Sequence, residues 1–194
     1  MKGRMMMVYQ WLYQSVVGPL YLTVENDSLT RLDYTPPKDW NKKEQSAQLD
    51  QTKQPLFQAI NEWLDRYFEG KQSQVEVQLA AKGTPFQQEV WKIIQEIPYG
   101  ETMTYGEIAQ RMAKQMGKEK MSAQAVGGAV GKNPLSIIIP CHRVIGKSGN
   151  ITGYGGGIKR KLTLLALEQV APEIYHVPEN QKEASKFVNQ SISK

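Results

Sequence analysis

The chain contains a single cysteine, Cys141, which His142 and Arg143 follow directly. A free thiol is mostly protonated at neutral pH, because its reference pKa is about 8.5. It becomes a nucleophile only beside a base or a positive charge, and both kinds of side chain are adjacent here. One cysteine cannot form an internal disulfide, and one cysteine with two histidines is too few for a structural zinc site. We therefore expect Cys141 to be an activated nucleophile and expect no metal or cofactor.

A histidine acts best as a base when a carboxylate holds its second ring nitrogen. The helix predicted over residues 158–169 carries one acidic residue, Glu168, among leucines. Neighbouring side chains on a strand point to opposite faces, so His142 reaches Cys141 only across a turn or through a water. Each residue also has a plainer interpretation: a small buried cysteine, a core histidine and a solvated helix-end acid. We expect the three to work together because Pro140 precedes the cysteine and favours a turn.

Several segments must position these residues. The apolar run 135–139 lies between Asn133-Pro134 and Pro140 and predicts a buried strand that ends at Cys141. The glycine-rich segment 153–157 lacks the Gly-Lys-Ser/Thr ending of a phosphate loop, so it predicts a loop or a flexible wall over a flat ligand.

Three helices are predicted before this run. Capping boxes at Thr84–Gln87 and Thr104–Glu107 begin the first two, and Ser122 is a suitable N-cap for a third helix over 123–132. The third helix consists almost wholly of small residues. Two helices joined by a short turn are the outline of a helix-turn-helix unit, although close helix packing would use the same residues. Basic residues adjoin it: Lys114, Lys118, Lys120 and Lys132.

The first 80 residues have a different pattern. Short β-favouring runs at 6–13, 20–25 and 29–34 predict an antiparallel meander, followed by a helix over 56–70 and a last strand over 75–79. Trp11 and Trp40 are expected to be packing residues. We place an N-terminal structural domain at residues 1–81, a second domain that carries the chemistry at 82–170, and a polar tail at 171–194.

The net charge of +5 is unevenly distributed. Residues 1–80 carry 9 basic and 10 acidic side chains, whereas residues 81–194 carry 15 and 9. A basic domain is typical of a polyanion-binding protein, although a soluble basic surface explains the charge equally well. No apolar run approaches the roughly 20 residues of a membrane span, so we expect a cytoplasmic protein without a membrane partner.

The sequence Ile138-Ile139-Pro140-Cys141-His142-Arg143-Val144-Ile145-Gly146, preceded by Asn133-Pro134 and followed by Gly153-Tyr154-Gly155-Gly156-Gly157, closely resembles the active-site signature of O6-alkylguanine-DNA alkyltransferases. The resemblance is strong over about residues 84–169 and general over the first 80. It implies an α+β fold: an N-terminal antiparallel sheet with a helix, ribonuclease H-like, and a mainly helical C-terminal domain of the winged-helix or helix-turn-helix type that carries the active site.

The resemblance also implies roles for individual residues. Cys141 would accept the alkyl group, His142 would deprotonate it through a water, and Glu168 would orient His142. Asn133 would brace the turn, and the Tyr105 hydroxyl would donate to the guanine ring. The guanine would be held by the carbonyls of Cys141 and Val144, the Gly155 amide and the Tyr154 ring, with pocket size depending partly on Ser136. DNA contacts would come from Ser122, Ala123, Gln124 and Arg143.

The implied function is direct repair of O6-alkylguanine in double-stranded DNA by a monomer that acts once, because a thioether is not hydrolysed and no second cysteine can resolve it. The lesion would be flipped out of the duplex. The family commonly has an arginine where this chain has Gln124, so we expect flipping to be assisted differently here. The sequence does not determine the range of alkyl groups or whether O4-alkylthymine is accepted.

Two other classes of function compete with this one. A cysteine hydrolase would need a separate histidine, and the only other one is His176 in the polar tail. A DNA-binding regulator or damage sensor would use the helix-turn-helix alone, and Cys141 would then be incidental. Relatives that only bind lesions lack the acceptor cysteine, which favours alkyl transfer.

Overall fold

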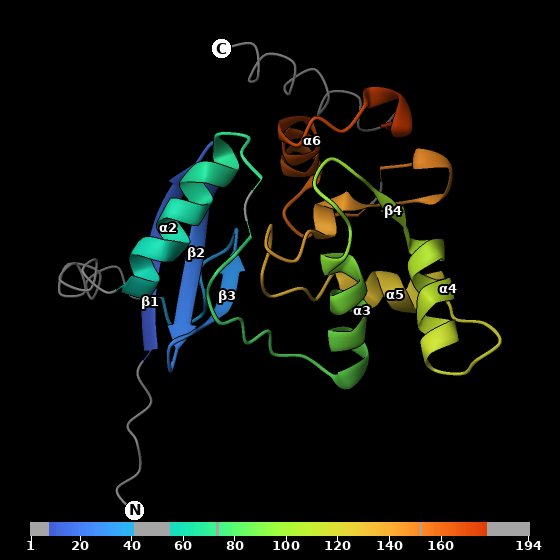
Figure 1. Cartoon of the computed structure of the whole chain (residues 1–194), viewed down its shortest axis with the longest axis horizontal. Helices are drawn as coiled ribbons and strands as arrows, with labels where there is room; N and C mark the ends of the chain where they lie inside the picture. Colours follow the sequence, from blue (N-terminus) through green and yellow to red (C-terminus); the bar gives the residue numbers. More distant parts are fainter. Residues whose placement is uncertain (1–7, 41–54, 73, 152, 178–194) are drawn as a thin grey trace, which may run out of the picture. The chain divides into compact units, whose positions relative to one another are not determined.

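The computed structural model describes residues 8–40, 55–72, 74–151 and 153–177. The chain forms two compact units, one of Met1–Lys82 with Pro134–Ser136 and one of Gly83–Asn133 with Ile137–Lys194 (Figure 1). The start of the first predicted strand, residues 41–54 and most of the predicted tail lie outside the described residues. No helix among the described residues is long and apolar enough to cross a membrane.

The first unit contains the predicted meander. Strands β1 (Val8–Ser15), β2 (Gly18–Glu25) and β3 (Ser28–Asp33) pair antiparallel in the order β1-β2-β3. Asn26 and Asp27 form the two-residue turn between β2 and β3 with φ of 46° and 63°. Asparagine and aspartate tolerate this left-handed backbone better than other residues with a Cβ, so the turn is determined locally.

Helix α2 (Pro55–Phe68) runs along the sheet and supplies the other half of this unit's core. Its buried residues recur at helical spacing: Phe57, Ile60, Trp63, Leu64 and Tyr67. Trp11 packs against Phe57 with ring centroids 3.7 Å apart, and its indole N–H donates to Asn61 Oδ1 at 3.1 Å. Trp40 packs edge-on against Tyr21. Both tryptophans therefore have packing partners.

Two predicted strands are wrong. Residues 75–79 form only one β-bridge, between Leu29 and Leu79. One edge of β3 is paired with β2, and the segment contacts the other edge only at Leu29. In the run 135–139, Leu135 bridges to Leu32 and belongs to the first unit, after which Ile137 turns the chain at φ 72°. Apolar, β-branched residues favour a strand locally, but the chain has to change units here.

The second unit is mainly helical and brings distant segments together. It contains α3 (Pro85–Gln95), β4 (Met103–Thr104), α4 (Tyr105–Gln115), α5 (Ala123–Val130), the 3-10 turn η2 (Cys141–Arg143), β5 (Val144–Ile145), the 3-10 turn η3 (Lys147–Gly149), α6 (Ile158–Leu167) and the 3-10 turn η4 (Pro172–Ile174). Strands β4 and β5 pair in parallel, which joins the start of α4 to the segment after the cysteine.

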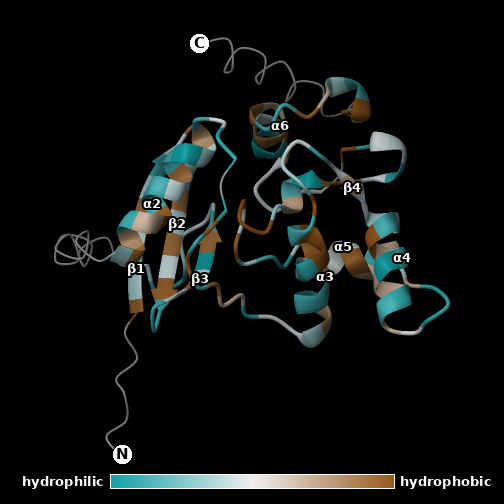
Figure 2. Ribbon diagram, viewed as in Figure 1, coloured by the Kyte–Doolittle hydropathy of each residue, from teal (hydrophilic) through white to brown (hydrophobic). Residues whose placement is uncertain are grey.

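Capping determines where these helices begin. Both predicted capping boxes are present, at Thr84 with Gln87 and at Thr104 with Glu107. The Ser122 hydroxyl accepts from the backbone N–H groups of Gln124 and Ala125 and so begins α5. The structure thus confirms the α+β fold with a helix-turn-helix made by α4 and α5. In Figure 2, α5 is coloured white to brown, whereas α4 carries hydrophilic residues on one side.

Candidate active site

The cysteine lies at the first residue of a 3-10 turn. Pro140 precedes the turn with φ −79°, and the Cys141 N–H donates to the Ile139 carbonyl at 2.7 Å. Successive side chains of a 3-10 helix point about 120° apart, so Cys141, His142 and Arg143 face three directions. The alternation of side chains expected of a regular strand therefore does not apply to Cys141 and His142.

The Asn133 amide connects the cysteine to the chain before it. Its Nδ2 donates to the Ile139 carbonyl at 2.8 Å and lies 3.0 Å from Cys141 Sγ. Cys141 is only 7% exposed, and burial raises the pKa of its thiol. The hydrogen bond from Asn133, the charge of Lys161 and a hydrogen bond from Tyr154 act in the opposite direction and lower that pKa. The site thus contains groups that stabilise a thiolate in a place where burial disfavours it.

His142 and Glu168 form a buried pair. His142 Nε2 and Glu168 Oε1 are 2.7 Å apart, and the two residues are 0% and 1% exposed. Burial lowers the pKa of His142 and outweighs the opposite effect of Glu168. Burial alone would raise the pKa of Glu168, but hydrogen bonds from His142 and Arg143 and the charge of Arg143 hold it far below its ordinary value. A neutral imidazole held by a carboxylate is the arrangement that a general base needs.

Arg143 completes this cluster and does not face solvent. Its Nε and Nη2 donate to the two carboxylate oxygens of Glu168 at 2.7 and 2.9 Å, and its Nη1 donates to the Ile97 carbonyl at 2.6 Å. The residue is 9% exposed. The prediction that Arg143 contacts DNA is therefore not supported, because its guanidinium is committed to the carboxylate that holds His142.

The remaining predicted site residues fall in different places. The Val144 carbonyl accepts from Lys161 Nζ at 2.5 Å. Tyr154 is half-buried and Gly155 is exposed, in a loop that closes with Gly157 N–H donating to the Tyr154 carbonyl at 2.8 Å. A methyl group at Gly155 would meet open space. Ser136 is grouped with the first unit, where its N–H donates to the Leu32 carbonyl.

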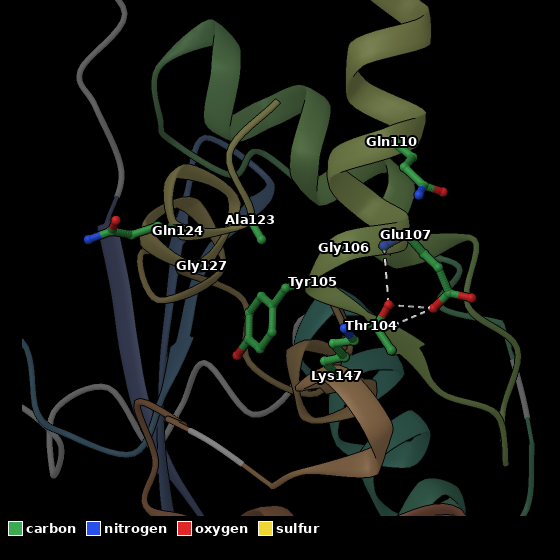
Figure 3. Close-up of a pocket in the computed structure, with 9 residues that line it drawn as sticks. All are labelled: Thr104, Tyr105, Gly106, Glu107, Gln110, Ala123, Gln124, Gly127 and Lys147. Atoms are coloured by element: carbon green, nitrogen blue, oxygen red, sulfur yellow. Dashed lines mark hydrogen bonds between the residues drawn. The ribbon is translucent and has the colours of Figure 1, made fainter. Parts of the chain in front are cut away.

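A cavity of about 600 Å³ lies between α4, α5 and η3 (Figure 3). It is lined by Thr104, Tyr105, Gly106, Glu107, Gln110, Ala123, Gln124, Gly127 and Lys147. The Tyr105 ring projects into this space, and its hydroxyl donates to the Gly153 carbonyl at 3.4 Å. Tyr105 therefore links the helix-turn-helix to the glycine-rich loop that follows the cysteine. Three predicted DNA contacts, Ser122, Ala123 and Gln124, form the exposed start of α5.

Comparison with known proteins gives one family for both units. Residues 8–81 match the ribonuclease-like domain of 6-O-methylguanine DNA methyltransferase, and residues 85–170 match its DNA-binding domain. The methylated-DNA--protein-cysteine methyltransferase of Haemophilus influenzae is 40% identical over 181 residues, which cover 90% of this chain and 93% of that protein. This chain belongs to that family.

Other methyltransferases of the family show the same extent of similarity. The Mycobacterium bovis methylated-DNA--protein-cysteine methyltransferase is 43% identical over 84% of this chain and 93% of its own length. The crystal structure of Mycobacterium tuberculosis O6-methylguanine methyltransferase is 42% identical, with a TM-score of 0.66 over 86% of this chain and 96% of that one. A related crystal structure holds the M. tuberculosis protein in complex with DNA, at 40% identity and a TM-score of 0.65 over 85% of this chain and 96% of that chain.

Sequence reasoning about this methyltransferase missed Lys161. The residue is 0% exposed and lies on the buried face of α6 with Leu162, Leu164 and Leu165. The signal was available, because position 161 is four residues before Leu165 and thus on the same helical face. A lysine on the apolar face of a helix is unusual enough to mark a site.

The buried His142–Glu168 pair predicts a pH dependence of stability. Both groups have a lowered pKa in the folded state, so as the pH falls the unfolded chain binds their protons first. Their contribution is complete above about pH 6.5 and is lost progressively below it, His142 first and Glu168 below about pH 4.3. We expect the free energy of unfolding, measured with urea, to fall between pH 7.5 and 5. The variant His142→Asn should flatten this part of the profile; equal slopes in both proteins would contradict the assignment.

Proposed function

We propose that this methyltransferase repairs O6-alkylguanine in double-stranded DNA by moving the alkyl group to Cys141, as a methylated-DNA-[protein]-cysteine S-methyltransferase. The observation that carries the proposal is the position of Cys141 Sγ, 3.0 Å from the Asn133 amide and on the same 3-10 turn as a histidine paired to a buried carboxylate. This nucleophile and base lie in the same unit as the helix-turn-helix.

The transfer is a displacement at the alkyl carbon. His142 removes the thiol proton of Cys141 through a water, and the thiolate attacks the carbon in line. The new S–C bond forms as the O6–C bond breaks. The electron pair of the O6–C bond stays on the oxygen of the departing guanine. The Tyr105 hydroxyl donates to the guanine ring and thereby stabilises the departing base. The product is a thioether on Cys141, so each molecule acts once.

The lesion must leave the duplex to reach a thiol that is almost fully buried. Extrusion of a nucleotide costs a few kcal/mol and is helped by side chains that occupy the vacated space. The exposed start of α5 and the cavity beside Tyr105 provide a surface for this step, with Ser122, Ala123 and Gln124 toward the DNA. The flipped guanine would then lie against Tyr154 and the Gly155 amide.

Gln124 gives a direct test of the flipping step. It lines the cavity and carries no charge. We expect Gln124→Arg to bind duplex DNA about five- to tenfold more tightly at low salt, because it adds one phosphate-attracting cation, and also to repair faster. Gln110→Arg, which adds the same charge to the same cavity, should raise affinity without raising the repair rate. Unchanged affinity and rate in Gln124→Arg would refute this role.

The basic residues in the last turn of α4 and after it predict a salt effect. Lys114, Lys118 and Lys120 line a second cavity of about 580 Å³, which shares Gly106, Gln110 and Ala123 with the first. If Lys118 and Lys120 contact phosphates, replacing both by glutamine should reduce the slope of log K against log salt by about two. Replacing Lys38 and Lys71 of the first unit by glutamine is the matched control. Equal slopes in both double variants would exclude the contacts.

The function itself is tested by intact-protein mass spectrometry. The protein is mixed with duplex DNA that contains O6-methylguanine, with Cys141→Ser as the control and a duplex with O4-methylthymine as a second substrate. A gain of one methyl group per molecule in the wild type alone supports the proposal. Binding without a mass gain would favour a damage sensor, and turnover of an ester substrate would favour a cysteine hydrolase.

A further inference from the structure

Lys161 is a buried cation that the proposed alkyl transfer does not use. It is among the largest fully buried side chains of the described chain, and its neighbours on the buried face of α6 are leucines. Its Nζ donates to the Val144 carbonyl, the first backbone carbonyl after the turn that holds the cysteine. Removing an ammonium from water costs several kcal/mol, so a lysine at this position needs a compensating interaction. A leucine or methionine would fill the same space without that cost.

The hydrogen bond to Val144 places the Lys161 ammonium beside the turn that holds Cys141 and His142. From η2, the charge of Lys161 acts on Cys141, whose pKa it lowers, and on His142, whose pKa it also lowers. Burial lowers the pKa of Lys161 itself to about 8, and Cys141 opposes that shift. Lys161 is therefore still mainly protonated at neutral pH. The lowering of the Cys141 pKa by Lys161 and the raising of the Lys161 pKa by Cys141 arise from the same electrostatic interaction.

With Lys161 protonated, the charges of the cluster balance only when the cysteine is ionised. The Glu168 carboxylate accepts hydrogen bonds from two of the three guanidinium nitrogens of Arg143, Nε and Nη2, and from one ring nitrogen of His142. With a neutral His142, these groups sum to zero before Lys161 is counted. Lys161 then adds one positive charge, which a Cys141 thiolate would neutralise and a thiol would not.

We propose that Lys161 is a positioning residue of the methyltransferase, which the Val144 carbonyl holds in place so that its ammonium stabilises the thiolate of Cys141. The inference rests on the proposed function only in that the thiolate is the species that accepts the alkyl group. The electrostatic coupling between Lys161 and Cys141 is a property of the free protein and can be measured without DNA. After alkylation the counter-charge is gone, so the spent protein holds its proton on Lys161 less firmly.

The test is the pH profile of iodoacetamide alkylation of the full-length protein, read by mass spectrometry. The chain has one cysteine, so the label reports a single thiol. We expect Lys161→Met to move the midpoint of the profile upward by about one pH unit and to slow alkylation at pH 7.5 about tenfold. Lys161→Arg should retain part of the effect. The matched control is Lys159→Met, an exposed position on the same helix, which should leave the profile unchanged.

A second measurement keeps the inference testable if Lys161→Met does not fold. The lysine Cε signals of the wild type and of Cys141→Ser are titrated by NMR. We expect one lysine with a pKa near 8 in the wild type and a lower pKa in Cys141→Ser, where the thiolate is absent. A folded Lys161→Met with the wild-type alkylation profile, or a buried lysine whose pKa is the same in both proteins, would overturn the proposal. Either result is independent of whether O6-methylguanine is repaired.

Discussion

Replacing Glu168 by glutamine is expected to lower the free energy of unfolding by about 3–5 kcal/mol and to remove measurable alkyl transfer. Glu168 accepts from both nitrogens of the Arg143 fork and from His142, and it is 1% exposed. A neutral amide leaves the buried guanidinium without its counter-charge. It also weakens the hydrogen bond that fixes the orientation of the His142 imidazole, which the proposed mechanism uses as the base. Urea unfolding at pH 7.5 and single-turnover repair measure the two effects.

The matched control for this variant is Glu96→Gln. Glu96 pairs with Arg111 at 3.2 Å, and both side chains are at least half exposed. Exposed ion pairs contribute about 0–1 kcal/mol, so this variant should be nearly as stable as the wild type and should repair at the same rate. If Glu168→Gln resembled Glu96→Gln in both measurements, the buried cluster would have no part in catalysis or stability.

Replacing Asn133 by aspartate is expected to slow alkyl transfer about ten- to hundredfold. The amide that now donates to Cys141 Sγ becomes a carboxylate 3.0 Å from the sulfur, so a stabilising hydrogen bond is exchanged for a repulsive charge. The pKa of the thiol, which burial already raises, should rise further. The rate of iodoacetamide alkylation against pH measures this change directly, and single-turnover repair measures its consequence.

Asn133 also braces the turn by donating to the Ile139 carbonyl, so a displaced cysteine would contribute to the same loss of rate. Asn133→Ala separates the two causes, because it removes both hydrogen bonds but adds no charge. It should raise the midpoint of the alkylation profile less than aspartate does. Gln95→Glu adds the same charge at an exposed position of α3 and controls for weaker DNA binding. Identical alkylation profiles in Asn133→Asp and Asn133→Ala would rule out the electrostatic explanation.

Local sequence determined the features that depend on neighbouring residues. The capping boxes at Thr84 and Thr104 and the N-cap at Ser122 all occur where the sequence predicted them. Each rests on a side chain that satisfies a backbone group within a few residues, so no tertiary information is needed. The motif around Cys141 likewise identified the family, and both family domains match the chain.

Only the tertiary structure decided which side chains share the buried site. The run 135–139 was predicted as a strand from its β-branched residues, but the chain turns at Ile137 between two units. Arg143 was predicted as a DNA contact and instead holds Glu168, and Lys161 was not singled out at all. The physical reason is the same for both charged residues. A charged side chain is buried only where a distant group compensates its desolvation, and that partner is 25 residues away for Arg143 and 17 for Lys161.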